Sequence, residues 1–200
     1  MNDLAAINTL DELYQLTDKV LEKAKVNYPS MLCKAGCNQC CKNYGSPQIL
    51  PVEWENIKYH LDSCDEEYKN QVQASLQVIK NNLKKMLIEN DNVPVDKVVN
   101  DITCPFLQNE LCSVYSIRPL VCRMFGSFLS KPGLISGNAV YTCGMEKDRW
   151  DEEITFTKPT LLNLPSKELF YKKLEQINSD KGKPKALLYY INKYFSEQLG

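Results

Sequence analysis

The spacing of apolar residues along the chain predicts a mainly helical protein. Apolar positions recur at intervals of three and four between Asp3 and Lys25, which predicts an amphipathic helix that ends before Pro29. A longer stripe at the same spacing predicts a helix of about six turns between Asp65 and Glu89. The residues of this stripe are Tyr68, Val72, Leu76, Ile79, Leu83 and Leu87. We expect them to belong to the hydrophobic core.

Three shorter helices are also predicted. One covers residues 51–61 and has a proline in its first turn, where the missing N–H carries no cost. The other two lie near residues 166–178 and 184–198, and the last of these has one broad apolar face. The segment from Pro29 to Pro51 contains glycine and proline among clustered cysteines, a composition that is typical of a ligand-bearing loop.

The pattern changes between residues 102 and 126. Two short apolar runs flank a polar turn there, which predicts a small β-hairpin. A helical turn should begin near Pro119, because proline is favoured at the start of a helix.

Two hundred residues are enough for one domain with a buried core. We therefore predict a single mainly α domain over residues 1–200. Its loop-rich cysteine core, 29–145, contains the inserted long helix and at most a small β-hairpin. An N-terminal helix over 1–28 and a helical segment over 146–200 wrap this core.

The charge balance argues against some partners. The chain has 24 basic and 25 acidic residues, so it has no overall electrostatic attraction for nucleic acid, and we expect none to bind. Acidic residues interrupt the first twenty positions, and no apolar run approaches the length of a membrane span. These features predict a soluble cytoplasmic protein without a membrane partner.

Nine cysteines are the unusual feature of the composition. Their odd number, without an export signal, favours metal ligation or thiol chemistry over a disulfide framework. Free cysteines are often just small buried hydrophobes, and such residues would be scattered along the chain. Four of the nine instead fall within residues 33–41, which indicates a site.

Eight cysteines are candidate metal ligands. Thiolates are soft ligands that suit zinc and iron–sulfur centres, and the Cys37-x2-Cys40 step is the strongest signal, because a short loop can present two sulfurs to one metal. The eight could serve one four-sulfur site with spares or two separate sites, and the sequence does not partition them. The candidates are Cys33, Cys37, Cys40, Cys41, Cys104, Cys112, Cys122 and Cys143.

Other residues near the cysteines have weaker claims. Cys64 lies between predicted helices and outside both groups, and the single histidine, His60, lies on the predicted helix over 51–61. We expect neither to be a ligand. Four thiolates around a zinc ion or a four-iron cluster leave a net charge near minus two. We expect Arg118 and Arg123 to help offset it by hydrogen bonding to sulfur.

Two blocks of this sequence resemble the YkgJ-type cysteine-cluster proteins, described as a zinc- or iron-chelating domain with a CxxCxxCC motif. The first is Cys37-Asn38-Gln39-Cys40-Cys41-Lys42, followed by a helix opened by Pro51-Val52-Glu53. The second runs from Cys104-Pro105-Phe106-Leu107 through Cys112 and Arg118-Pro119 to Gly126. The resemblance spans about residues 33–145 and implies metal or cluster binding. One departure is the Cys33-x3-Cys37 step, where the family motif has two intervening residues.

Three functions remain open from the sequence. The first is a binding protein for zinc or an iron–sulfur cluster, with the metal and a further protein as its partners. The second is an iron–sulfur-dependent oxidoreductase or a protein-modifying enzyme, since a related motif occurs in the flagellin lysine methylase FliB. No glycine-rich turn for a nucleotide cofactor is present in support of it. The third is a thiol redox protein that uses Cys37 with Cys40, or Cys40 with Cys41.

Overall fold

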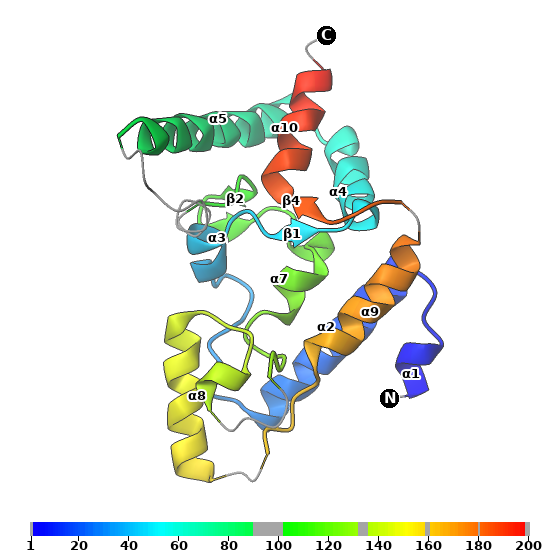
Figure 1. Ribbon diagram of the computed structural model, residues 1–200, viewed down its shortest axis with the longest axis vertical. Helices are drawn as coiled ribbons and strands as arrows, with labels where there is room; N and C mark the ends of the chain where they lie inside the picture. Colours follow the sequence, from blue (N-terminus) through cyan, green and yellow to red (C-terminus); the bar gives the residue numbers. More distant parts are fainter. Residues whose placement is uncertain (1, 90–101, 132–135, 159–160, 180, 199–200) are drawn as a thin grey trace. The chain divides into compact units, whose positions relative to one another are not determined.

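The structure is a computed structural model that describes residues 2–89, 102–131, 136–158, 161–179 and 181–198. Helices account for most of these residues, and the strands among them form two small two-stranded sheets (Figure 1). The prediction of a mainly α fold is confirmed.

The chain divides into two compact units, each built from segments that are distant in sequence. The first unit combines Met1–Cys37 with Pro119–Lys181, and the second unit combines Asn38–Arg118 with Gly182–Gly200. The chain therefore passes from the first unit to the second within the cysteine-rich loop, just after Cys37. That the whole chain acts as one domain stays a prediction.

The first unit is helical. Its N-terminal helices pack beside later ones, with α2 against both α7 and α9, as Figure 1 shows for α2 and α9. A short 3-10 turn over Gly137–Ala139 packs on α8. The helices are α1 (Asn2–Ala5), α2 (Leu10–Asn27), α7 (Leu120–Met124), α8 (Gly144–Thr157) and α9 (Lys167–Asn178).

The N-terminal segment forms two helices where one continuous helix was predicted. The break lies before Thr9, which has an extended backbone and caps the second helix. Its hydroxyl accepts a hydrogen bond from the Glu12 amide, and the Glu12 carboxylate accepts one from the Thr9 amide at 3.0 Å. This reciprocal pair satisfies two amides that a helix start otherwise leaves open, so α2 begins here.

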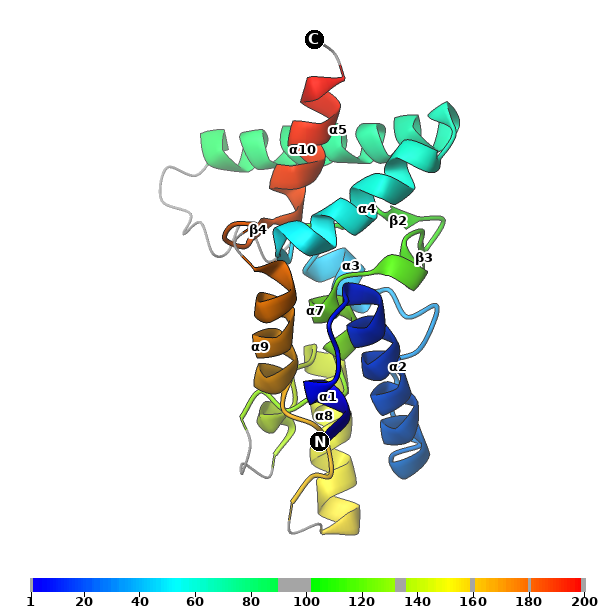
Figure 2. The same ribbon diagram turned by 90° about the vertical axis from the view of Figure 1, so that its right-hand side faces the viewer.

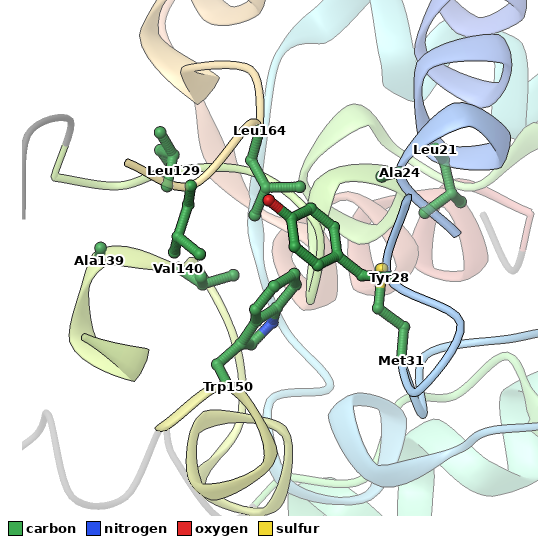
Figure 3. Close-up of a cluster of buried hydrophobic side chains, with 10 residues drawn as sticks. Leu21, Ala24, Tyr28, Met31, Leu129, Ala139, Val140, Trp150 and Leu164 are labelled. Atoms are coloured by element: carbon green, nitrogen blue, oxygen red, sulfur yellow. The ribbon is translucent and has the colours of Figure 1, made fainter. Parts of the chain in front are cut away.

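The core of the first unit surrounds Trp150, a fully buried residue of α8. Tyr28 meets its ring edge to face, with the ring centroids 4.8 Å apart (Figure 3). The Trp150 indole N–H also donates to the Gly126 carbonyl at 3.1 Å. Buried side chains from α2 and from the segments around it complete the cluster: Leu21, Ala24, Met31, Leu129, Ala139, Val140, Leu162 and Leu164.

In its described residues, the second unit contains three longer helices and both sheets. Figure 2 shows α10 (Leu187–Glu197) crossing α5 (Glu66–Glu89), and α10 also contacts α4 (Pro51–Ser63). One antiparallel sheet pairs β1 (Gln48–Ile49) with β4 (Lys185–Ala186), and the other pairs β2 (Leu107–Gln108) with β3 (Leu111–Cys112). A short helix, α3 (Gln39–Asn43), and a 3-10 turn, η1 (Tyr115–Ile117), complete it.

Several predicted elements of the second unit are confirmed. Helices α4 and α5 and the β2–β3 hairpin lie where they were predicted. Val72, Leu76 and Ile79 of the predicted stripe on α5 are buried, while Leu87 lies outside the residues whose side chains are described. The segment predicted as a loop contains α3, so the cysteine-rich region is partly helical.

No helix in the described ranges has both the length and the apolar character that a membrane crossing requires.

Candidate metal centre

Four cysteines of the second unit are brought together by three local structures. Cys40 and Cys41 lie on the short helix α3, where neighbouring side chains point about 100° apart. Cys104 comes from the segment that enters the hairpin, and Cys112 lies on strand β3. The sequence grouped these residues only as members of a larger set of eight.

A close backbone approach places Cys104 beside α3. The Cys104 amide donates to the Cys41 carbonyl at 2.6 Å, and the Gly45 amide donates to the Ile102 carbonyl at 2.7 Å. A Cβ on Gly45 would lie 2.1 Å from the Cys104 nitrogen and 2.4 Å from the Ile102 oxygen. Only a residue without a side chain therefore allows the two segments to come this close.

The hairpin is tied to α3 through its turn. Asn109 and Glu110 occupy the turn with positive φ values of 49° and 64°, the conformation of a two-residue hairpin loop. The Glu110 carboxylate accepts a hydrogen bond from the Asn38 side-chain Nδ2 at 2.6 Å and forms an ion pair with Lys42 at 2.5 Å. These contacts hold the hairpin, and with it Cys112, close to α3.

The thiols of α3 and of the hairpin interact directly. The Cys41 thiol is hydrogen-bonded to Cys112 and to Cys40. Hydrogen bonding with Cys112 and Cys40 favours the protonated form of Cys41 and raises the pKa of its thiol. The same hydrogen bonding favours the thiolates of Cys40 and Cys112 and lowers their pKa values to about 7. Burial raises the pKa of Cys104 to about 12.

Arg118 provides positive charge at this cluster. It follows the turn η1, and its guanidinium stacks on the Tyr115 ring, with Cζ 3.8 Å from the ring centroid. Next to the hydrogen bonds from Cys41, its charge is a further cause of the lowered pKa of Cys40 and of Cys112. The positive charge of Arg118 therefore acts on the Cys40 and Cys112 thiols. The predicted hydrogen bonding of Arg118 to sulfur stays a prediction.

The remaining candidate ligands, Cys33, Cys37, Cys122 and Cys143, all belong to the first unit. Cys143 occupies the N-cap position of α8, Cys122 lies on α7, and the Cys37 amide donates to the Lys34 carbonyl in a tight turn.

Arg123 also belongs to the first unit. It is buried, forms an ion pair with Asp18 at 2.5 Å, and lies over the Tyr14 ring. Its predicted role beside sulfur is not tested by these contacts.

Cys64 and His60 interact with each other. The Cys64 sulfur lies 3.5 Å from the His60 Nε2 atom, at the end of α4. Such a contact within one helix end accounts for both residues without a metal. That neither residue is a ligand stays a prediction.

The donor set fits a soft metal, although it is not pre-shaped for one. Nowhere in the described ranges is a group of three or more Cys, His, Asp or Glu side chains arranged so that it could hold a metal ion. The Cys41 thiol instead interacts with the Cys40 thiol and with the Cys112 thiol. A metal bound by all four sulfurs therefore requires some of these side chains to turn about their Cα–Cβ bonds.

Sequence reasoning missed two features of this centre. Gly45 was not singled out, although a glycine soon after the cysteine run marks a place where another backbone can approach. Glu110 and its link to α3 were also missed, because a contact between residues about 70 positions apart leaves no local pattern.

The fold and its thiols define a mainly helical domain with a cysteine cluster. The chain belongs to the CxxCxxCC family, described as a "Putative zinc- or iron-chelating domain", whose profile matches residues 32–136. The match covers just over half of the chain, includes all the candidate ligands except Cys143, and confirms the resemblance noted from the sequence. Comparisons with curated proteins and with solved structures gave no match.

Proposed function

We propose that the second unit binds a metal centre, either a zinc ion or an iron–sulfur cluster, through Cys40, Cys41, Cys104 and Cys112. The observation that carries this proposal is the hydrogen bond of 2.6 Å from the Cys104 amide to the Cys41 carbonyl, which places the segment that enters the hairpin against α3. Membership of a family described as zinc- or iron-chelating supports it. Four thiolates complete the coordination of a structural zinc ion or of a cluster.

The electrostatics of the cluster support the same proposal. Metals bind thiolates, so a site benefits from thiols that lose their protons near neutral pH. Cys40 and Cys112, with pKa values of about 7, meet that requirement. Cys41 and Cys104 keep their protons until a metal displaces them, so loading the site releases protons to the solvent. Arg118 offsets part of the negative charge of the loaded site.

A thiol redox function is the second candidate, and the same lowered pKa values favour it. A thiolate at Cys40 or Cys112 beside the Cys41 thiol is the arrangement from which a disulfide can form when an oxidant is supplied. This candidate requires only two cysteines, and it predicts protein without bound metal.

An enzyme that uses an iron–sulfur cluster requires iron and sulfide at these same four cysteines. The choice between zinc and a cluster therefore comes before any question of substrate. The nine cysteines are all free thiols. This state suits a reducing compartment, and we propose a cytoplasmic location on that ground.

The test is metal analysis with a visible absorption spectrum on protein purified without oxygen. We expect zinc with a colourless solution, or iron and sulfide with a brown chromophore. Cys112→Ser should lower the metal content, and the matched control Cys64→Ser should leave it unchanged. If protein with reduced thiols contains neither zinc nor iron, the metal proposal is wrong and the thiol redox function is favoured.

A further inference from the structure

We propose that Cys33, Cys37, Cys122 and Cys143 form a second four-thiol site for a soft metal, contained entirely in the first unit. This inference rests on the proposed function, since it assigns a metal to the four cysteines that the first site leaves unused. It divides the eight candidate ligands into two sets of four along the boundary between the compact units.

Gly126 joins the Cys33 loop to the segment that leads into Cys143. As at the first site, no three of these cysteine side chains are arranged for a metal among the described residues, so metal binding requires thiols to turn about their Cα–Cβ bonds. A Cβ on Gly126 would lie 2.2 Å from the Cys33 sulfur, so Cys33 already occupies the space of the missing side chain. The Gly126 amide donates to the Tyr141 carbonyl at 2.6 Å, two residues before Cys143. Cys122 lies on α7, which ends at Met124, two residues before Gly126.

Glu146 links the Cys33 loop to the start of α8. It is fully buried in the first turn of α8, which Cys143 caps. Its carboxylate accepts a hydrogen bond from the Leu32 amide at 2.9 Å, directly before Cys33. Arg149 neutralises this carboxylate through an ion pair of 2.8 Å. Glu146 is thus engaged in joining the Cys33 loop to the start of α8.

A backbone turn connects Cys33 to Cys37, the fourth cysteine of the proposed site. The Cys37 amide donates to the Lys34 carbonyl at 3.0 Å, and Gly36 adopts a φ of +90° inside this turn. The three residues between Cys33 and Cys37 allow such a turn. Three residues between Cys33 and Cys37, where the family motif has two, are therefore still compatible with a pair of ligands.

Two buried hydroxyls provide an independent indication of a ligand here. Ser127 follows Gly126 and is fully buried, and Thr142 precedes Cys143. Among the described residues, neither the Ser127 hydroxyl nor the Thr142 hydroxyl has a hydrogen-bond partner. Buried hydroxyls normally find one. Hydroxyls beside metal-bound cysteines can donate to thiolate sulfur, which is the acceptor that a loaded site would supply.

Counting metals in the wild-type protein gives the first test. Two four-thiol sites predict about two zinc ions, or two clusters, per chain, measured by metal and sulfide analysis with native mass spectrometry. About one centre per chain would overturn the second site while leaving the proposed function intact. No metal at all would instead overturn the proposed function, so the two failures differ.

Two glycine variants test whether the second site lies in the first unit. Gly126→Ala places a methyl group on the Cys33 sulfur and should remove about half of the metal. The matched control is Gly144→Ala, beside Cys143, where a Cβ meets nothing within 4 Å, and it should retain the full amount. Full metal content in folded Gly126→Ala would contradict the assignment.

Cys33→Ser tests the same assignment with a smaller change in shape. It should also lose about half of the metal, and Cys33→Ser combined with Cys112→Ser should lose all of it. If Cys33→Ser and Cys112→Ser each remove all the metal from protein that keeps its helical circular dichroism, the eight cysteines serve one shared centre and the proposal is wrong.

Discussion

Replacing Gly45 with alanine should open the proposed metal centre of the second unit. The added Cβ would lie 2.1 Å from the Cys104 nitrogen and 2.4 Å from the Ile102 carbonyl oxygen. Both neighbours are backbone atoms, so the conflict can be relieved only by moving the Cys104 segment away from α3. Two hydrogen bonds would be lost, Gly45 to Ile102 and Cys104 to Cys41.

The loss of stability in Gly45→Ala can be estimated from these contacts. Two backbone hydrogen bonds contribute about 2 kcal/mol together, and overpacking a close contact costs about 1–3 kcal/mol. We therefore expect Gly45→Ala to lower the free energy of unfolding by about 3–5 kcal/mol. The metal content should fall as well, because Cys104 no longer lies beside Cys41.

Urea unfolding and metal analysis measure the two effects on the same preparations. Gly144→Ala is the control, because a Cβ there meets no atom within 4 Å. A Gly45→Ala protein that unfolds within about 0.5 kcal/mol of wild type and keeps its metal would refute the close approach of the two segments.

Three further predictions concern charge and capping. Arg118→Ala should raise the pKa values of Cys40 and Cys112, because the nearby positive charge is lost. An ultraviolet thiolate titration of metal-free protein measures these pKa values, and unchanged values would show that Arg118 does not act on the two thiols. With folded pKa values of about 7 against an ordinary 9.0, these two thiols bind fewer protons in the folded state than in the unfolded state. Their contribution to stability is therefore present above pH 9 and lost as the pH falls through 7. The urea midpoint of reduced, metal-free protein should rise between pH 7 and 9, and an unchanged midpoint would argue against these lowered pKa values. Thr9→Ala should lower the free energy of unfolding by about 1 kcal/mol, because it removes the hydroxyl that caps α2. The control Asn8→Ala, next to the cap, should lower it by less in the same urea unfolding assay.

Strong periodicity predicted the long elements well. The stripe on α5 needed no tertiary information, because its apolar residues repeat along one helix face. Helix α8 lies largely in the segment 146–200 that was predicted to be helical, but it was not predicted as a separate helix. Two of its buried positions are the charged pair Glu146 and Arg149, so its inward face lacks a continuous apolar pattern. The sheet that joins β1 to β4 was also missed, since two-residue strands so far apart in the chain carry no local signal.

The break between α1 and α2 could have been found from the sequence. Thr9 and Glu12 have the spacing of a capping box, a local signal that marks a helix start. The apolar repeat extends across this position and concealed it.

The eight candidate ligands follow from the sequence, but the grouping that we propose for them does not. Soft thiolates at short spacing indicate a metal site without any structure. Their division depends on two glycines that admit close contacts, Gly45 at Cys104 and Gly126 at Cys33. It depends also on where the chain leaves the first unit, between Cys37 and Asn38. These are tertiary facts, and residue spacing does not encode them.

X-ray absorption at the edge of the bound metal, on protein purified without oxygen, tests the central claim most directly. If the cysteines hold the metal, the first shell contains about four sulfur atoms per metal at about 2.3 Å. A shell of nitrogen or oxygen at about 2.0–2.1 Å would contradict thiolate ligation and with it the proposed centre.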